Sequence, residues 1–405
     1  MKVDQMIRVL FISPVPELAG GAEHSLVDIL TGLSSHGIEP VALCPGEGSL
    51  ATALRNNSIP VIVRTWPKNL LKMSRKRPVL ALGRFVISFG GLFRLVFQMR
   101  QVIREGGYSL VSTNGIKAHL ISLPATFRLA PVLWHFRDYP PSVLGRLFFS
   151  LAGSFIPRRI IAPSYTIGRI FGTGPAKKKQ VTVYNGIRAE RFQNVPDHLM
   201  EKARAELDIA GSRPVIGVIG ALVRIKGFHI VMQAMPQVLE RFPDSRLLIV
   251  GGKLYDTDVS GERQRLEQTA RSLGIEKAVR FAGTRDDVPV MLHIMDVFVH
   301  SSLIPEPFGR VIVEAMAAGT PVIGSVPGAV DEIIRNRETG TLVPSGDSDA
   351  LARALIEVLS DRERTEDMTN QARKDVLSRF DLAVTVSRTA EIYRETADLK
   401  ASEKT

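Results

Sequence analysis

Two glutamates, Glu306 and Glu314, are separated by seven residues in the segment EPFGRVIVEAMAAG, residues 306–319. Apolar residues recur there at helical spacing from Val311 onward, and Gly309 stands where such a helix would begin. The pattern predicts a loop carboxylate, a helix N-terminus and a second carboxylate one to two turns into the helix. The N–H groups of a helix N-terminus suit a diphosphate, and the carboxylates can accept hydrogen bonds from vicinal hydroxyls of a sugar or a ribose. The competing interpretation is an amphipathic surface helix with two solvated glutamates.

Three more segments place polar residues or glycines at predicted strand and helix ends. Lys226 and Gly227 stand where a loop enters a helix, and a lysine there supplies a compact positive charge for diphosphate oxygens. His135 ends the apolar run PVLWH, so it should face the ligand-binding edge of a sheet, although a buried structural histidine fits equally well. Gly20 and Gly21 precede a helix and let the backbone approach an anion closely; a plain turn is the alternative.

The elements that would position these residues are short β-branched runs that alternate with helical patterns. The predicted strands are 7–13, 39–44, 60–65, 109–113, 131–135 and 158–164 in the first half, and 213–220, 245–252, 278–283, 295–302 and 320–325 in the second. Near-continuous apolar strands separated by helices are typical of parallel sheets buried on both faces. The expected fold is therefore α/β, with two Rossmann-like, doubly wound parallel-sheet domains that face a central cleft.

A chain of 405 residues exceeds one ordinary hydrophobic core, which favours two domains. The segment RFQNVPDHL interrupts the strand–helix rhythm and sets the expected boundary. We predict a basic first domain over 1–193, a second domain over 194–380, and a separate final helix over 381–405.

Positive charge is concentrated in the first half of the chain. Residues 1–195 contain 25 Lys and Arg against 9 Asp and Glu, whereas residues 196–405 contain 27 against 32. No helix-turn-helix, zinc-finger or RNA-binding motif accompanies this charge, so nucleic acid is not an expected partner. An anionic membrane surface or a phosphate-bearing acceptor fits better.

The cysteine content and the first residues of the sequence indicate the cellular compartment. Cys44 is the single cysteine, which excludes an intramolecular disulfide and favours a reducing compartment. The opening MKVDQMIRVLFIS has the pattern of a strand, so a cleaved signal peptide is not expected. The expected location is the cytoplasm, with the inner face of the membrane as an alternative for a peripheral protein.

The strongly apolar segment 79–99 is long enough to span a membrane. Arg84 and Arg94 lie inside it, and two unpaired arginines would cost about 2.5–3.5 kcal/mol each near a bilayer centre, so a membrane span is not expected. An interfacial helix and a core helix of the first domain fit the pattern equally well. Residues 142–159, SVLGRLFFSLAGSFIPRR, share this character and favour contact with a membrane surface.

The C-terminal half resembles a known family. The stretches VRFAGTRDDVPVMLHIMDVFVHSS, EPFGRVIVEAMAAGTPVIGSVPGAVDEII and GTLVPSGDSDALARAL are similar to the family-4 glycosyltransferases. These are retaining enzymes of the GT-B fold, in which a Glu-x7-Glu motif holds a nucleotide sugar. The resemblance implies that Glu314 accepts hydrogen bonds from the ribose hydroxyls and that Glu306 contacts the donor sugar.

The resemblance also implies that the first domain binds the acceptor, that the second binds the nucleotide sugar, and that the final helix over 381–405 returns to the first domain. It further implies roles for residues around the motif. Backbone amides of the helix start would face the sugar and diphosphate, and a strand near residue 281 would read the base. The implied donor-binding residues are Phe308, Gly309, Arg310, Val311, Phe281 and Gly283. His135 would hydrogen-bond the donor sugar, Gly20 and Gly21 would face the diphosphate and acceptor, and Lys226 would neutralise the diphosphate, which makes Glu306, Lys226 and His135 the implied catalytic group. Where the family has an arginine, this chain has Ala221, and Arg224 is a candidate substitute.

The implied activity is that of a retaining hexosyl- or related transferase. It would move a sugar from a UDP- or GDP-linked donor to a saccharide or lipid-linked saccharide, in polysaccharide or envelope glycan synthesis, with no cofactor and no bound metal. Asp256 and Asp258 have the spacing of a metal motif but lack matching ligands. Two alternatives remain open: a nucleotide-sugar epimerase of the same fold, and a non-catalytic homologue that acts as a binding partner.

Overall fold

The computed structural model describes residues 6–18, 20–67, 89–140, 142–252 and 259–402. The chain divides into two compact units: residues 1–185 with 382–405, and residues 186–381. The division therefore falls between Asn185 and Gly186, whereas the sequence predicted a boundary at 193–194. Because the final helix is grouped with the first unit, that unit is discontinuous in sequence.

In the part of the first unit that is described, seven parallel strands form one sheet in the order β3-β2-β1-β4-β5-β6-β7. These strands are β1 (Ile7–Ile12), β2 (Ile38–Cys44), β3 (Val61–Val63), β4 (Leu110–Asn114), β5 (Val132–His135), β6 (Arg159–Ala162) and β7 (Gln180–Thr182). The helices are α1 (Gly21–Leu33), α2 (Ser49–Asn56), α5 (Phe89–Glu105), α6 (Ile116–Thr126), α7 (Val143–Phe155), α8 (Tyr165–Gly168), α9 (Pro175–Lys179) and α18 (Leu382–Ser402).

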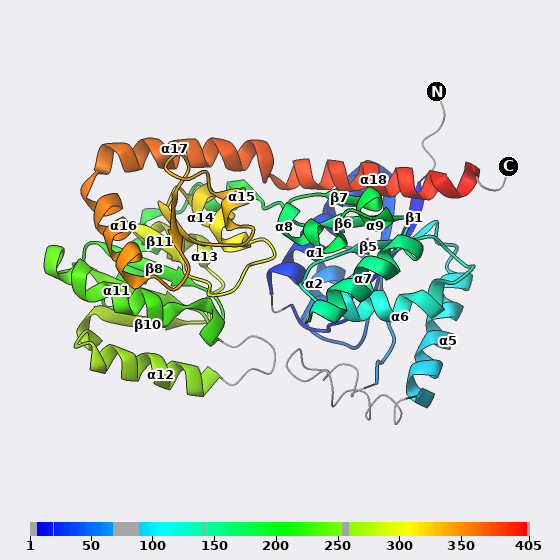
Figure 1. Ribbon diagram of the computed structural model, residues 1–405, viewed down its shortest axis with the longest axis horizontal. Coiled ribbons are helices and arrows are strands. Elements are labelled where there is room, and N and C mark those ends of the chain that lie inside the picture. Colours follow the sequence, from blue (N-terminus) through cyan, green and yellow to red (C-terminus); the bar gives the residue numbers. More distant parts are fainter. Residues whose placement is uncertain (1–5, 19, 68–88, 141, 253–258, 403–405) are drawn as a thin grey trace. The chain divides into compact units, whose positions relative to one another are not determined.

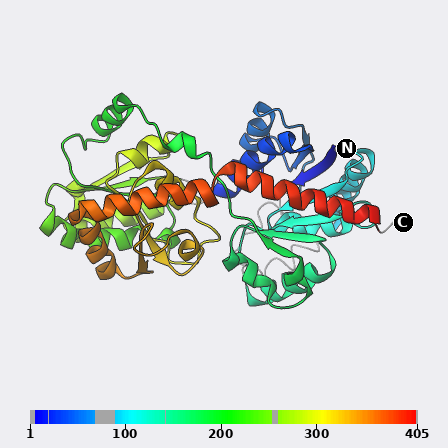
Figure 2. The same cartoon turned by 90° about the horizontal axis from the view of Figure 1, so that it is seen from above.

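Alternate residues of these strands enter cores on opposite faces of the sheet, as the period of two requires. In β1, Val9 and Phe11 pack with residues of α1, α2 and α18, whereas Leu10 and Ile12 pack with α5 and α6. The face that α5 and α6 cover continues along β5 and β6, where α7 packs. The last helix, α18 (red), lies across the elements of the first unit in both views (Figure 1, Figure 2).

The second unit repeats this architecture. Six parallel strands are present among its described residues, in the order β10-β9-β8-β11-β12-β13. They are β8 (Val215–Ile219), β9 (Arg246–Val250), β10 (Val279–Gly283), β11 (Val297–His300), β12 (Val322–Val326) and β13 (Thr341–Pro344). The helices are α10 (Asp197–Glu206), α11 (Phe228–Arg241), α12 (Val259–Ser272), α13 (Val288–His293), α14 (Arg310–Ala318), α15 (Val330–Ile333), α16 (Ser348–Ser360) and α17 (Arg362–Arg379), and a 3-10 turn spans Arg224–Lys226.

The predicted fold class is confirmed, since each unit is a Rossmann-like parallel sheet with helices on both faces. Each sheet also ends in an edge strand that the sequence did not predict, β7 and β13. Both are short, and most of their residues are half-buried, so they lack the continuous apolar run of a central strand. Of the segment 79–99, residues 79–88 lie outside the described residues, and the remainder belongs to α5, which buries Leu95 and Met99 in the core.

Candidate functional site

The candidate site of the second unit lies where the strand order of its sheet reverses. The neighbouring strands β8 and β11 continue to opposite sides of the sheet, and ligands of open α/β sheets bind beyond the carboxyl ends of such strands. Lys226 belongs to the turn after β8, His300 is the last residue of β11, and Glu306 lies in the loop that follows. The fold thus brings Lys226 next to Glu306, which is 80 residues further along the chain, and places His300 beside the same carboxylate.

Glu306 is the centre of this group. The Lys226 ammonium donates a hydrogen bond to its Oε1 atom at 2.5 Å, and His300 Nε2 lies 3.7 Å from the same oxygen, which is too long for a hydrogen bond. Burial opposes ionisation of Glu306, but the nearby His300 imidazole and Lys226 ammonium outweigh it and hold the pKa of the carboxyl well below its usual range. Glu306 is therefore a carboxylate at neutral pH, and its side chain is 16% exposed.

The turn that carries Lys226 is fixed to the loop after β11. The Ser301 hydroxyl donates to the Lys226 carbonyl at 2.8 Å, and the Leu303 amide donates to the Ile225 carbonyl at 2.8 Å. Gly227 has φ +68°, and a Cβ there would lie 2.0 Å from the Ser301 carbonyl oxygen. Only glycine permits this close approach, which sets the position of the lysine.

The backbone of Glu306 is held from its other side by the loop after β12. The Ala329 amide donates to the Glu306 carbonyl at 3.1 Å. Gly328 has φ +147°, and a Cβ there would lie 2.8 Å from the Glu306 nitrogen. The carboxylate is therefore positioned by backbone contacts as well as by its side-chain partners.

The helix α14 begins beside this loop, at Gly309 with φ +103°. Arg310 Nε donates to Glu314 Oε1 at 2.8 Å, and both side chains are 15% exposed. The Phe308 ring is buried against Phe380, with ring centroids 5.9 Å apart, so only the backbone of Phe308 is available to a ligand. Glu314 thus lies one turn inside the helix, as the spacing predicted, and Arg310 neutralises it.

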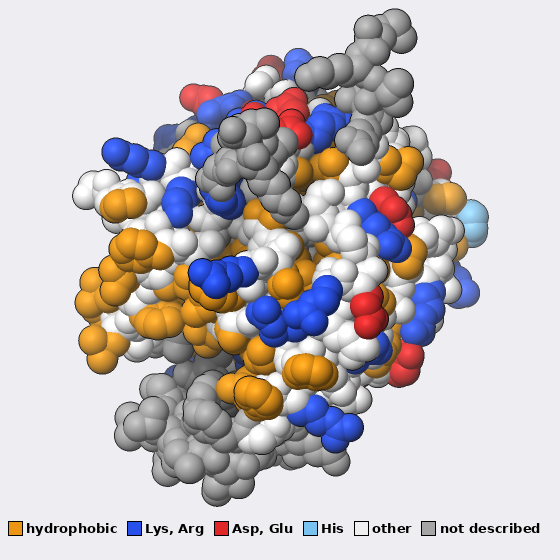
Figure 3. Space-filling view, turned by 90° about the vertical axis from the view of Figure 1, so that its right-hand side faces the viewer, with side chains coloured by type: hydrophobic (Ala, Val, Ile, Leu, Met, Phe, Trp, Pro, Cys, Tyr) orange, Lys and Arg blue, Asp and Glu red, His pale blue; other side chains and the backbone are white. Residues whose placement is uncertain are grey.

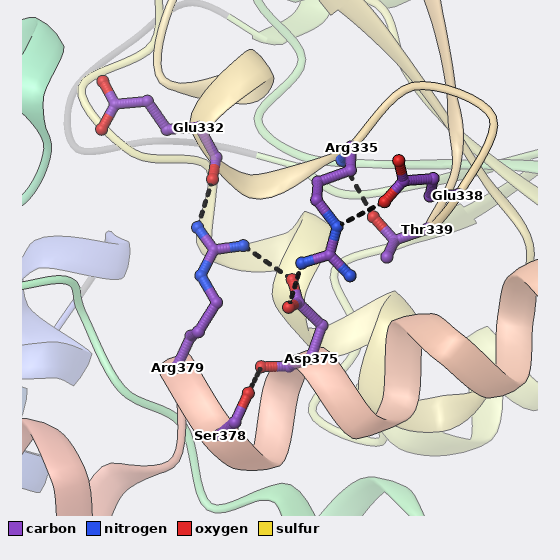
Figure 4. Close-up of polar contacts among 7 residues, drawn as sticks. All are labelled: Glu332, Arg335, Glu338, Thr339, Asp375, Ser378 and Arg379. Atoms are coloured by element: carbon purple, nitrogen blue, oxygen red, sulfur yellow. Dashed lines mark hydrogen bonds and ion pairs between the residues drawn. The ribbon is translucent and has the colours of Figure 1, made fainter.

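A network beneath α15 supports the same loop (Figure 4). The buried Asp375 carboxylate accepts from Arg335 NH1 at 2.5 Å and from Arg379 NH1 at 2.7 Å. The Arg379 guanidinium also donates to the Glu332 carbonyl, while the Glu332 carboxylate points away from the network in Figure 4. The network ties α17 to the short helix that follows Gly328.

The other predicted donor-side residues lie elsewhere in the second unit. Phe281 packs against the core, and the Arg263 guanidinium lies 4.8 Å from its ring centroid. Gly283 ends β10 with φ +70°, and its carbonyl accepts from the Gly251 amide. Arg224 is exposed, and its side chain makes no hydrogen bond or ion pair with any described residue. No contact therefore joins Arg224 to the group around Glu306 among the described residues.

In the first unit, His135 is the last residue of β5 and is 2% exposed. Burial, the neighbouring Arg137 and His119 hold the pKa of His135 well below its usual range, so the imidazole is neutral. Arg137 NH2 lies 3.4 Å from His135 Nδ1, and Arg137 NH1 donates to Asn185 Oδ1 at 2.5 Å. His135 can thus donate or accept a hydrogen bond but does not supply positive charge.

Gly20 and Gly21 lie at the start of α1, after β1, which is the strand at which the order of this sheet reverses. The Gly20 amide donates to Glu23 Oε2 at 3.0 Å, so the first turn of the helix is capped by its own carboxylate. This acidic side chain occupies a donor that an anion would otherwise use.

Sequence reasoning missed His300 and Ser301. His300 directly follows the apolar run VFV and Ser301 comes next, so the strand-end argument that singled out His135 would have found His300. Neither ring nitrogen of His300 has a hydrogen-bond partner among the described residues, and the side chain is 5% exposed. The buried imidazole therefore acts on Glu306 through its electrostatic contact.

Lowering the pH from about 5 to about 3 is expected to destabilise the native chain more than its Glu306→Gln variant. A carboxyl whose folded pKa lies below its unfolded value of about 4.3 stabilises the fold above that value, and the stabilisation is lost as pH falls toward the folded pKa. Urea unfolding of both proteins across this range measures the difference, with the exposed Glu338→Gln as control. Parallel pH profiles for the native chain and the Glu306 variant would contradict the depressed pKa.

In the described ranges, no group of three or more His, Cys, Asp or Glu side chains is arranged to hold a metal ion. Asp256 and Asp258 lie outside the described residues. No helix in the described part of the chain combines the length and apolar character needed to cross a bilayer.

The chain matches proteins of known family over most of its length. A family model described as "Glycosyl transferases group 1" matches residues 200–375, and one described as "Glycosyltransferase Family 4" matches residues 19–191. A D-inositol 3-phosphate glycosyltransferase of Corynebacterium urealyticum is 35% identical over 224 residues, which are 54% of this chain and 51% of that protein. A phosphatidyl-myo-inositol mannosyltransferase of Mycobacterium leprae is 36% identical over 174 residues, which are 42% of this chain and 44% of that protein.

Among solved structures, Anabaena HepE in complex with UDP-glucose superposes with a TM-score of 0.81 at 26% identity, covering 96% of this chain and 100% of that one. The chain spans about half the length of the curated relatives it matches. The two family models together match most of both units, although β1 and α18 lie outside the matched ranges, and the fold agrees with that of the solved neighbour. The chain therefore belongs to the family-4 glycosyltransferases and has their GT-B architecture.

Proposed function

We propose that this chain is a retaining glycosyltransferase that moves a hexosyl or related sugar from a UDP- or GDP-linked donor to a saccharide or lipid-linked saccharide acceptor. The observation that carries the proposal is the Lys226–Glu306 contact beside His300 at the strand-order reversal of the second unit. It joins one fixed cation and one fixed carboxylate at a site that suits a nucleotide sugar. Family membership supports the reaction class, and the UDP-glucose complex of HepE supports the donor class.

In this proposal the second unit binds the donor. Lys226 offers its ammonium to the diphosphate, and Glu306 accepts hydrogen bonds from the sugar hydroxyls. Glu314 accepts from the ribose, with Arg310 fixing its orientation. Positive charge held next to the leaving diphosphate stabilises the charge that develops as the glycosidic bond breaks, and such preorganised electrostatics supply much of catalysis in enzymes.

The first unit would bind the acceptor. The neutral His135 imidazole would hydrogen-bond a hydroxyl of the donor sugar, and the Gly20–Gly21 loop would face the diphosphate and acceptor. We assign no cofactor and no bound metal to the reaction. The proposed setting is polysaccharide or envelope glycan assembly in the cytoplasm, with peripheral attachment to an anionic membrane surface.

Calorimetric titration with UDP, GDP and ADP, first in EDTA and then in magnesium, tests the donor site. We expect one nucleotide to bind without metal, which would identify the base and narrow the choice of sugar. Failure of all three nucleotides to bind would favour the non-catalytic homologue. Conversion of a nucleotide sugar without acceptor would favour the epimerase.

Glu314→Ala is expected to weaken binding of that nucleotide by about 10- to 100-fold, because the loss of a hydrogen bond to a charged group costs about 1.5–3 kcal/mol. Glu314→Gln keeps an acceptor oxygen and should lose less. The same titration measures both variants. Equal affinity of the native chain and Glu314→Ala for the nucleotide would contradict the assignment of Glu314 to the ribose hydroxyls.

A further inference from the structure

One helix of the first unit, α7, exposes most of its apolar side chains. Phe149 and Gly153 are the buried residues of α7, a helix of 13 residues. Leu144, Leu147 and Leu151 are 78%, 62% and 65% exposed, and they recur at the spacing of a single helix face. Most amphipathic helices turn such a stripe toward a core, but here a second apolar stripe faces outward.

Neighbouring helices extend this apolar surface. The described residues include 18 exposed large hydrophobic side chains, and 11 of them belong to α5, α6, α7 or the residue after α6. These 11, which we call the apolar surface, are Phe93, Phe97, Leu120, Leu123, Phe127, Val143, Leu144, Leu147, Phe148, Leu151 and Phe155. All three helices cover the same face of the sheet. Concentration on one face distinguishes this surface from the scattered exposed residues that any protein carries.

Basic residues greatly outnumber acidic ones in the segment that carries the apolar surface. Residues 89–179 contain 13 Lys and Arg but only 2 Asp and Glu. The Lys179 ammonium donates to the Ser154 carbonyl at 2.7 Å, which places the lysine run of α9 against α7. Figure 3 shows hydrophobic side chains gathered on this side of the molecule, with lysine and arginine side chains among them.

We infer that this apolar surface, with its surrounding Lys and Arg residues, is a docking surface for an anionic lipid bilayer. Apolar side chains can enter the boundary between headgroups and acyl chains, and the cations can meet anionic headgroups. A second copy of the chain fits less well, because its own apolar surface would bring the same positive charge into contact. This inference deepens the proposed function by naming the surface from which a lipid-linked acceptor would be reached.

Vesicle sedimentation of the full chain without nucleotide tests the inference. We expect the native chain to sediment with vesicles that contain phosphatidylglycerol at low salt, to bind less at high salt, and to remain in solution with phosphatidylcholine alone. The combined change Leu144→Ser, Leu147→Ser and Leu151→Ser should lower the partition coefficient by about tenfold or more. Lys178→Glu changes the charge by two units, and each unit should lower the partition coefficient by about fivefold.

Matched controls lie on other elements. The combined change Leu199→Ser, Leu377→Ser and Val384→Ser alters three exposed apolar side chains outside the apolar surface, and Lys374→Glu reverses an exposed charge in the second unit. Both controls should bind vesicles as the native chain does. The α7 variant should keep the native Tm, since its three leucines are exposed.

Several results would overturn the inference. The native chain could fail to bind anionic vesicles, or the α7 variant could bind them unchanged. Light scattering could show a native dimer that the α7 variant dissociates, with no vesicle binding, which would identify a self-association surface. Nucleotide titration of the same samples separates the two proposals, because loss of UDP or GDP binding with intact vesicle binding would count against the donor site alone.

Discussion

Lys226→Ala is expected to lower kcat/KM for sugar transfer by about 10²- to 10³-fold, the range found when one preorganised charge-stabilising donor is removed from an active site. The ammonium is the one cation in hydrogen-bond contact with Glu306 among the described residues. Its loss removes positive charge from the proposed diphosphate site and leaves the partly buried Glu306 carboxylate without its ammonium partner. Initial rates with the donor identified by titration measure the effect.

Arg224→Ala is the matched control, since both residues belong to the same turn. Arg224 is exposed and contacts neither Lys226 nor Glu306, so its removal should change kcat/KM by less than about threefold. A loss as large as that of Lys226→Ala would show instead that Arg224 compensates for Ala221. Comparable activity of Lys226→Ala and the native chain would remove Lys226 from the catalytic group.

Asp375→Ala is expected to lower the free energy of unfolding of the second unit by about 1.5–3 kcal/mol, the cost of losing hydrogen bonds to a charged group, because the Arg335 and Arg379 side chains left behind are 39% and 29% exposed. Asp375 is 4% exposed and accepts from both Arg335 and Arg379, so its loss leaves two guanidinium groups without their shared carboxylate. Because Arg379 also holds the Glu332 carbonyl, we expect nucleotide binding to weaken as the loop at Gly328 loosens.

Two optical probes separate the units in this experiment. The two tryptophans, Trp66 and Trp134, belong to the first unit, so fluorescence follows that unit while far-UV circular dichroism follows both. The midpoint of urea unfolding followed by circular dichroism should fall for Asp375→Ala. The midpoint followed by fluorescence should change less. Glu338→Ala is the control, because Glu338 pairs with Arg335 at the surface and should cost less than about 1 kcal/mol. An unchanged circular dichroism transition for Asp375→Ala would contradict the prediction.

The central strands were predictable because burial on both faces demands continuous apolar runs, as in IRVLFI and VIGVI. The edge strand Gln180–Thr182 could not be predicted in this way, because its three half-buried residues follow a lysine run and do not form a continuous apolar run. The Glu306–Glu314 spacing predicted a loop carboxylate and a helical one, and the structure has this arrangement. The contact between Lys226 and Glu306 depends on two strands becoming neighbours, which local sequence does not encode.

His300 and the α7 stripe show two different limits of sequence reasoning. The sequence locates His300 at a strand end, but its distance from Glu306 comes from the loop geometry around Gly328. The apolar composition of residues 142–159 does not indicate whether the leucines are buried or exposed. Exposure of Leu144 and Leu151 could be found only from the structure, because a buried helix has the same composition.

The discontinuity of the first unit has a consequence for how the chain is built. Tyr393 of α18 is fully buried, its hydroxyl lies 3.0 Å from Ser112 Oγ, and its ring contacts Phe11. During synthesis the strands of this unit leave the ribosome before the second unit, but the helix that completes their core leaves after it. The second unit, continuous from Gly186 to Asp381, can fold in the meantime. The first unit therefore matures only after the second has been synthesised, and one apolar face of its sheet stays uncovered while residues 186–381 are made.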